Sequence, residues 1–385
     1  MSSSNIKNIC FIGAGTMGCF NSLVASVAGY ECKIFDQSEN VLNERINNQT
    51  LLTQYLNQSN FFEGKDISSA ISRIKNCNNI NDALEKADLV SESIPENLNL
   101  KIKLFNEIES IVNKNIILTT NTSSLSIKKI SEGLHPDTKF AALHSYLGSK
   151  LMDVVRGTYT SDQTINSLVD YIKSVDSYPL ILNKEHQGYV LNFMLSGLLT
   201  QSLLMVIENK HTIQDIDAAW KDLNSSQFGP FGMMDMFGLD VVRQAWQEKD
   251  SDSSHLMHKD KIVDFLLQYT DKNYLGLKTF RGFYNYKDID INYKKDNFAE
   301  IQKDLCVSII EAAVVLHTRK IVHKDEINKA WIVGTNLSKG PFDFLSNMGI
   351  TSYLKNYEDW VARDYISPEF HSLVRTCLSE LIKHS

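Results

Sequence analysis

The sequence predicts an α/β doubly wound N-terminal domain followed by an all-α C-terminal part, and three observations support this prediction. Up to about residue 187, short runs rich in β-branched residues alternate with helical patterns. This alternation is typical of a mostly parallel sheet with helices on both faces. Beyond Gly188 the pattern is helical only, and it contains an internal repeat. We therefore expect one sheet domain and a duplicated helical unit.

The strands of the first domain are predicted from their apolar, β-branched composition and their short length. In chain order we expect them at residues 9–12, 31–36, 87–90, 115–119, 139–143, 151–155 and 178–182. A polar helical hairpin over about residues 38–81 interrupts the alternation after the second strand. The first domain is accordingly assigned to residues 1–187.

The helical part contains two similar segments separated by 111 positions. Residues 215–220 followed by Gly-Pro-Phe at 229–231 match residues 326–331 followed by Gly-Pro-Phe at 340–342. A match of this length favours a tandem duplication. We expect the two copies to cover residues 188–295 and 296–385. The triplets are interpreted as helix terminators and packing corners, and residues 276–286 as a linker packed on the first copy.

Charge and cysteine content exclude several classes of protein. The chain has 385 residues, 39 Lys and Arg against 46 Asp and Glu, a net charge of -7 and no Lys/Arg run longer than a pair, so we expect no nucleic-acid partner. The six cysteines are scattered, with neither disulfide nor zinc-ligand spacing. This pattern predicts no metal site and a reducing, cytoplasmic location. No signal peptide is recognised at the start of the sequence.

One apolar stretch, residues 188–207, is long enough to span a membrane. Its polar residues Asn192, Ser196 and Thr200 recur every four positions and so share one helix face. We therefore expect a buried helix that lines a polar site, and no membrane partner.

Three glycines follow the first predicted strand with the spacing Gly13-x-Gly15-x-x-Gly18. The motif opens a helix, and Asp36 ends the next strand about 20 residues later, which is the Rossmann arrangement for a dinucleotide. The first glycine makes the turn, the second admits a pyrophosphate and the third lets the helix pack on the strand. Because Asp36 accepts from ribose hydroxyls and repels a 2'-phosphate, we expect NAD rather than NADP.

Several further segments resemble the L-3-hydroxyacyl-CoA dehydrogenase family. The matching segments are residues 13–18, 35–37, 92–97, 121–126, His144, 188–192, 229–231 with Asp235, and 282–284. They run in the order of the family over about residues 5–290. The resemblance implies a Rossmann-type domain, a helical domain and an acyl-CoA substrate. The second helical copy resembles family members that carry the C-terminal domain twice.

The resemblance also assigns residues to the site. It places the catalytic base on His144, its hydroxyl partner on Ser123, an amide on Asn192 and the carboxylate that orients the base on Asp153, where the family has Glu. A histidine suits this role because its pKa lies near neutral pH. The expected cofactor-binding residues are Gly13, Ala14, Gly15, Thr16, Met17, Gly18, Asp36, Gln37, Ser93, Glu96 and Lys101.

The sequence departs from the family pattern in three respects. The family segment His-Phe-Phe-Asn-Pro is here residues 144–148, His-Ser-Tyr-Leu-Gly, and the interval to Asp153 is shorter. From residue 38 to 62 the hairpin, which offers basic residues to CoA in the family, contains one cation, Arg45. Lys65 and Arg73 remain as substitutes.

The leading hypothesis is therefore an NAD-dependent oxidoreductase that interconverts a 3-hydroxyacyl thioester, with CoA as carrier, and its 3-oxoacyl form. One alternative is a dehydrogenase of a free hydroxy acid or of an acyl group on a carrier protein. Another is an NAD-binding protein without turnover. Since the helical domain forms the dimer contact in the family, we expect the second copy to take the partner's place. The chain would then be competent as a monomer, with a homodimer as the alternative.

Overall fold

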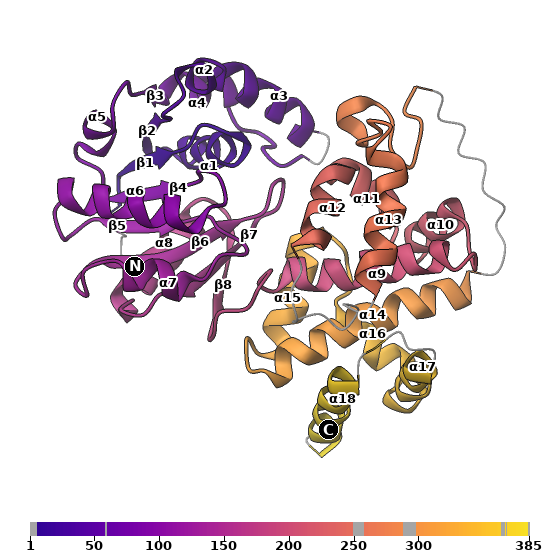
Figure 1. The fold of residues 1–385 in the computed structure, drawn as a ribbon. Coiled ribbons are helices and arrows are strands. Elements are labelled where there is room, and N and C mark those ends of the chain that lie inside the picture. The colour runs from indigo at the N-terminus through magenta and orange to yellow at the C-terminus, as the bar shows by residue number, and fades with distance from the viewer. Residues whose placement is uncertain are drawn as a thin grey trace. The chain divides into compact units, whose positions relative to one another are not determined.

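The computed structural model describes residues 6–57, 60–248, 258–287, 298–362, 366 and 368–383, drawn in Figure 1. It divides into two compact units, which are described separately. The first comprises Met1–Tyr189 with Val333–Thr335, and the second comprises Val190–Ile332 with Asn336–Ser385.

The first unit is built on a sheet in which, over the described residues, eight strands lie in the order β3-β2-β1-β4-β5-β6-β7-β8. All neighbouring pairs are parallel except β6 and β7. The strands are β1 Asn8–Ile12, β2 Glu31–Phe35, β3 Lys75–Asn76, β4 Leu89–Glu92, β5 Ile117–Thr120, β6 Lys139–Ser145, β7 Leu151–Arg156 and β8 Tyr178–Leu182. The order of the first six is that of the Rossmann fold, so the predicted fold class is confirmed.

Helices cover both faces of this sheet because its strands are apolar on both sides. The helices are α1 Thr16–Val27, α2 Glu39–Asn43, α3 Arg45–Asn57, α4 Ile67–Arg73, α5 Ile80–Leu84, α6 Leu98–Ile111, α7 Ile127–Glu132 and α8 Asp162–Ser174. Leu23 of α1 and Leu168 of α8 belong to one core together with Ala141 of β6. Phe140, the neighbour of Ala141, points to the other face, where its ring meets Phe105 of α6 at 5.1 Å.

The segment predicted as a helical hairpin over about residues 38–81 is only partly helical. It contains α2, α3 and α4, but β3 and the start of α5 follow within the same range. β3 has two residues, Lys75 and Asn76, and both are polar and exposed. Because no apolar run marks such a short edge strand, sequence periodicity missed it.

The second unit is helical. Its helices are α9 Leu191–Ile207, α10 Ile213–Asn224, α11 Pro230–Phe237, α12 Leu239–Gln247, α13 Lys259–Thr270, α14 Ala299–Thr318, α15 Lys324–Thr335, α16 Pro341–Met348, α17 Ile350–Ala362 and α18 Pro368–Lys383, with the short 3-10 helix η2 Leu277–Thr279 after α13. The first residues of α10, α11 and α12 precede those of α15, α16 and α17 by 111 positions each, which is the offset of the sequence repeat.

Equivalent positions of the two repeats contact one another. α9 packs against α14, and an ideal Cβ on Gly197 would lie 3.0 Å from the carbonyl oxygen of Ser308, the residue 111 positions later. Trp220 and Trp331, which are separated by the same offset, meet edge to face at 6.4 Å. Both tryptophan side chains are fully buried. Each of these two contacts therefore joins equivalent positions of the two repeats, as in a twofold-symmetric dimer.

The two Gly-Pro-Phe triplets begin helices, so their interpretation as helix terminators is wrong. Gly229 and Gly340 are the N-caps of α11 and α16, and the following proline is the first residue of each helix. Proline suits this position because the first helical N–H has no partner to lose.

The segment between the repeats is tied to the first copy by two buried carboxylates. Asp235 accepts from the backbone N–H groups of Phe283 and Tyr284 at 2.9 and 3.0 Å. Asp217 accepts from Phe231 N–H at 2.8 Å and from the Tyr284 hydroxyl at 2.9 Å. These contacts agree with the expectation that residues 276–286 pack on the first copy.

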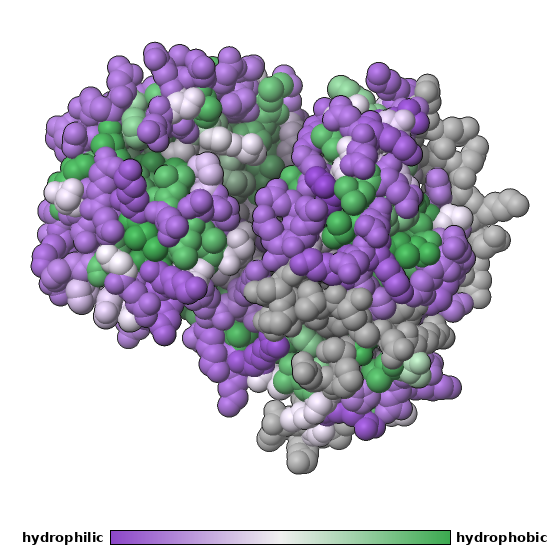
Figure 2. Space-filling model, in the orientation of Figure 1, coloured by the Kyte–Doolittle hydropathy of each residue, from purple (hydrophilic) through white to green (hydrophobic). Residues whose placement is uncertain are grey.

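The visible surface is mostly hydrophilic, with hydrophobic residues in small groups (Figure 2). Among the residues that the structure describes, no helix, α9 included, has the length and apolarity needed to cross a membrane.

Candidate active site

The three glycines of the loop between β1 and α1 differ in the space that an added Cβ atom would find. Gly13 has φ +99°, and an ideal Cβ there would lie 2.5 Å from the Ser93 carbonyl oxygen. On Gly18 a Cβ would lie 1.8 Å from the Gly13 oxygen, whereas on Gly15 it would meet no heavy atom within 4 Å. Gly15 is thus the position where a ligand can approach the backbone, at the N-cap of α1. Thr16 and Met17 form the first turn of this helix.

Asp36 follows β2 and ties the loop in place. Its Oδ2 accepts from Ala14 N–H at 2.8 Å and its Oδ1 accepts from Ser38 N–H at 2.8 Å. Each carboxylate oxygen keeps one lone pair for a further donor such as a ribose hydroxyl. The adjacent Gln37 is exposed.

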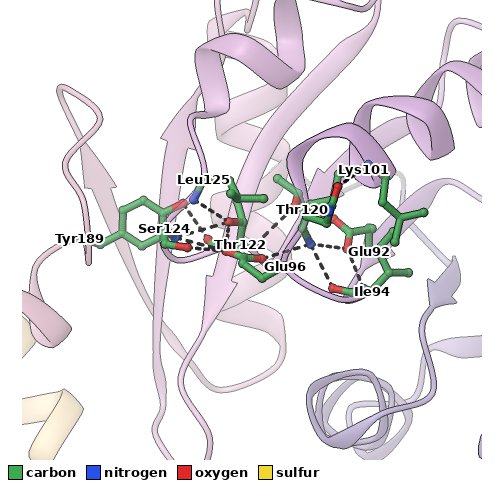
Figure 3. Close-up of polar contacts among 11 residues, drawn as sticks. Glu92, Ile94, Glu96, Lys101, Thr120, Thr122, Ser124, Leu125 and Tyr189 are labelled. Atoms are coloured by element: carbon green, nitrogen blue, oxygen red, sulfur yellow. Dashed lines mark hydrogen bonds and ion pairs between the residues drawn. The ribbon is translucent and has the colours of Figure 1, made fainter. Parts of the chain in front are cut away.

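A buried ion pair stands between β4 and α6 (Figure 3). The Lys101 ammonium lies 2.6 Å from Glu92 Oε1 and 3.4 Å from Glu96 Oε2, and it donates to the Ile94 carbonyl at 3.2 Å. Lys101 is 1% exposed and Glu92 is 0% exposed. Thr120 donates to the second oxygen of Glu92 at 2.5 Å. Each of the two buried charges is therefore paired and hydrogen-bonded, as such groups require.

Glu96 links the ends of β4 and β5. Its Oε1 accepts from the Thr122 hydroxyl and, at 2.9 Å, from the Ser124 hydroxyl. Partial burial opposes ionisation, but these hydrogen bonds and the Lys101 charge outweigh it and lower the pKa of Glu96 below its ordinary value. Glu96 is 39% exposed and is thus an ionised acceptor that a ligand can reach.

These residues fit a dinucleotide. Gly15 leaves backbone N–H groups of the α1 N-terminus open to a phosphate, and Asp36 retains acceptor capacity for a ribose. Within the described part of the chain, the Ser93 hydroxyl is buried without a hydrogen-bond partner, a donor that a bound ligand would satisfy.

His144 and Asp153 lie opposite each other on β6 and β7. His144 Nδ1 is 3.4 Å from Asp153 Oδ2. The two residues are 6% and 0% exposed. The rings of Tyr146 and Tyr189 pack edge-on against the imidazole, with centroids at 4.4 and 5.1 Å. His144 and Asp153 therefore lie close together, although the interval between them and the carboxylate side chain are both shorter than in the family pattern.

Ser123 and Asn192 lie in different units. Ser123 is half-buried in the loop after β5, and its carbonyl accepts from Gly188 N–H at 3.1 Å. Helix α7 is capped by the Ser126 side chain, not by Ser123. Asn192 is half-buried in the first turn of α9. Its approach to His144 stays a prediction.

Sequence reasoning missed some residues of this region. Glu92 and Thr120 complete the Lys101 pair, Glu185 accepts from Ile127 N–H at 2.8 Å at the start of α7, and Tyr146 donates to Asp153. Glu92 lies in residues 92–97, one of the segments that resemble the family. A charged residue at the end of an apolar strand was a signal that could have identified it. The roles of the other three depend on tertiary contacts that no local pattern encodes.

Comparison with known families agrees with this architecture. The model of the NAD binding domain of 3-hydroxyacyl-CoA dehydrogenase matches residues 8–186, and the model of the C-terminal domain of the same enzyme matches residues 188–286. The second match ends before α14, so the second helical repeat lies outside it.

Individual relatives agree with these matches. A probable 3-hydroxyacyl-CoA dehydrogenase of Caenorhabditis elegans is 31% identical over 293 residues, covering 74% of this chain and 97% of the relative. The mitochondrial hydroxyacyl-coenzyme A dehydrogenase of Homo sapiens is 28% identical over 293 residues, covering 73% and 92%. The solved 3-hydroxybutyryl-CoA dehydrogenase of Escherichia coli, 18% identical, shares the fold with a TM-score of 0.77 over 97% of this chain and 99% of that one. The chain therefore belongs to the 3-hydroxyacyl-CoA dehydrogenase family and is an NAD-dependent oxidoreductase.

Proposed function

We propose that this oxidoreductase interconverts a 3-hydroxyacyl-CoA and its 3-oxoacyl form, with His144 as the general base. The observation that carries the proposal is the buried His144–Asp153 pair on adjacent strands, in which His144 Nδ1 lies 3.4 Å from Asp153 Oδ2. Family membership supplies the reaction class, and the pair supplies a base of suitable type in the NAD-binding unit.

The pair fixes which imidazole nitrogen accepts the proton. We assign the tautomer in which Nδ1–H of His144 donates to Asp153, so that Nε2 keeps its lone pair and takes the proton of the substrate hydroxyl. The Asp153 charge then stabilises the imidazolium that forms. In the reverse direction the same nitrogen returns the proton.

Two further side chains hold the substrate in this proposal. The Ser123 hydroxyl, which does not cap α7, donates to the reacting oxygen, and the Asn192 amide donates to a substrate oxygen. Bound NAD would supply the hydride acceptor for the carbon that carries the hydroxyl. The glycine loop 13–18, Asp36, Gln37, Ser93 and Glu96 hold the cofactor, and Lys101, whose ammonium is already occupied, acts by holding Glu96.

The test is NADH oxidation by the purified chain with acetoacetyl-CoA, compared with His144→Ala. General bases contribute about 10²–10⁴ in rate, so we expect the variant to lose roughly a thousandfold in kcat and to keep NADH affinity. His135→Ala is the matched control, because His135 is an exposed histidine of the same unit. Activity that survives in His144→Ala would refute the role of this residue.

One observation favours a second candidate substrate, a free hydroxy acid or a carrier-bound acyl group. Arg45, the one cation between residues 38 and 62, is 4% exposed. Its guanidinium donates to Asn76 Oδ1 at 2.6 Å, to Gln49 Oε1 at 2.7 Å and to the Ile71 carbonyl at 3.2 Å. A side chain held in this way is not available to the phosphates of CoA.

Of the two neighbouring candidates, Arg73 is held by the protein in a similar way. The Arg73 guanidinium donates to Ser69 Oγ at 2.7 Å and to the Ser26 carbonyl at 2.8 Å, while Lys65 is exposed. On α3, Ile46 and Leu51 are 54% and 55% exposed, so apolar side chains stand on this surface.

Comparing acetoacetyl-CoA with acetoacetyl-pantetheine, which lacks the nucleotide, separates the two candidates. If the CoA nucleotide is recognised, kcat/KM falls at least tenfold for the pantetheine ester. An equal kcat/KM for both esters favours the carrier-bound substrate. Faster turnover of free acetoacetate than of either ester favours the free acid.

We also propose that the chain works as a monomer. We assign domains at residues 1–187, 188–295 and 296–385, in which the second helical copy replaces the partner of a dimer. The like-to-like contacts of Gly197 with Ser308 and of Trp220 with Trp331 support this assignment. Sedimentation velocity should give a single monomeric species, and an obligate dimer would contradict the proposal.

We propose a cytoplasmic location because of the state of the cysteine thiols. The described thiols of Cys10, Cys19, Cys32, Cys77 and Cys306 are free and buried, as expected in a reducing compartment. Fractionation of cells that express the tagged chain tests this location, and recovery with an organelle would contradict it.

A further inference from the structure

A tyrosine shares the carboxylate of the His144–Asp153 pair. The hydroxyl of Tyr146 donates to Asp153 Oδ2, the same oxygen that faces His144 Nδ1 at 3.4 Å. Tyr146 is 9% exposed, and its ring meets the imidazole at 4.4 Å, edge to face. It stands two residues after His144, where side chains leave an extended chain on the same side. The three groups therefore form one buried cluster.

The carboxylate has little other support. Among the described residues, Asp153 Oδ1 is buried without a hydrogen-bond partner. The contact with His144 is close to the outer limit for a hydrogen bond. Burial without donors favours the neutral form of a carboxyl group. The Tyr146 hydroxyl is thus the donor that lies clearly within hydrogen-bonding distance of Asp153.

We propose that Tyr146 is a positioning residue for the base, which holds the Asp153 carboxylate oriented toward His144. This inference rests on the proposed role of His144. Tyr146 touches neither substrate nor cofactor in this scheme and acts through Asp153. Tyr146 lies in the segment after His144 where the chain departs from the family pattern. Its hydrogen bond to Asp153 is therefore a feature of this sequence and not of that pattern.

The effect of removing the hydroxyl has a definite sign. A donor to a carboxylate stabilises the more negative state of the pair, so its loss makes the pair bind a proton more readily. The acid limb of the pH profile of kcat then moves to higher pH. A charge-assisted hydrogen bond of ordinary strength corresponds to a shift of about one pH unit.

Tyr189 is the second tyrosine whose ring packs against His144. Burial, together with the charges of Asp153, Glu185 and Glu96, raises the pKa of Tyr189 well above its ordinary value. Tyr189 therefore stays neutral through the acid limb.

The experiment is the pH dependence of kcat for oxidation of 3-hydroxybutyryl-CoA by the full chain with NAD. Tyr146→Phe keeps the ring against His144 and removes only the hydroxyl. Tyr189→Phe is the matched control, since its hydroxyl donates to the Thr122 carbonyl at 2.8 Å and not to Asp153. We expect the acid limb to move up by about one pH unit in Tyr146→Phe and to stay in place in Tyr189→Phe.

A double variant tests the path of the effect. If Tyr146 acts through Asp153, Tyr146→Phe lowers kcat several-fold in the wild-type background and has no further effect in Asp153→Asn. An unmoved acid limb, an equal shift in Tyr189→Phe, or additive losses in the double variant would each overturn the proposal. Loss of activity in His144→Ala together with a wild-type profile in Tyr146→Phe would refute only the role of Tyr146. Full activity in His144→Ala would refute the proposed function itself.

Discussion

Two alanine substitutions in the glycine loop should have opposite consequences. At Gly18 an added Cβ would lie 1.8 Å from the Gly13 carbonyl oxygen, so backbone must move, and overpacking of this kind costs about 1–3 kcal/mol of stability. At Gly15 an added Cβ meets nothing within 4 Å, and its φ of -70° suits any residue. We expect Gly15→Ala to change the free energy of unfolding by less than about 1 kcal/mol.

In the proposed arrangement, the methyl group of Gly15→Ala nevertheless occupies the space of the pyrophosphate. We expect NADH affinity to fall at least tenfold, which corresponds to about 1.4 kcal/mol. The assay pairs urea denaturation with a titration of NADH fluorescence on wild type and both variants. If Gly15→Ala binds NADH as tightly as wild type, the cofactor does not approach this backbone and the assignment of the loop is wrong. Equal loss of stability in both variants would refute the steric distinction.

Two further predictions concern buried charges. Burial raises the pKa of Asp217 from 3.8 to about 6, so the folded chain binds this proton more tightly than the unfolded chain, and stability is lost as the pH rises. Between pH 4 and 7 the free energy of unfolding of wild type, measured in urea, should fall by up to about 3 kcal/mol relative to Asp217→Asn, which copies Asn328 of the second repeat; parallel curves would contradict this. Lys101→Met leaves Glu92 charged and buried, and should cost about 3–5 kcal/mol in the same assay. Adding Glu92→Gln should recover most of that loss, and no recovery would show that the pair is not the cause.

The sheet was predictable because its signals are local. Apolar runs such as residues 9–12 and 31–36 mark buried parallel strands, and the glycine motif with Asp36 places the first two side by side. β3 was missed because an edge strand of two polar residues buries nothing. The Gly-Pro-Phe triplets were placed at the wrong end of a helix, since their residues occur in both turns and first helical turns.

The site was predictable in its residue types but not in its contacts. The sequence left open whether the short interval separates His144 from Asp153. The register of β6 on β7 decides this, because it sets the two residues directly opposite each other. Arg45 looked available to a phosphate, yet a cation on a polar helix can turn inward if the fold offers acceptors, as Gln49 and Asn76 do here. Such pairings depend on packing between segments distant in sequence.

The most direct test of the central claim is a single-turnover experiment with NADH already bound. Wild type and His144→Gln are mixed with saturating acetoacetyl-CoA, and the first turnover is followed by NADH absorbance. If His144 transfers the proton, the variant binds NADH normally and its single-turnover rate falls by roughly 10²–10⁴. An unchanged rate in the variant, or no NADH oxidation by wild type that binds NADH, would contradict the account.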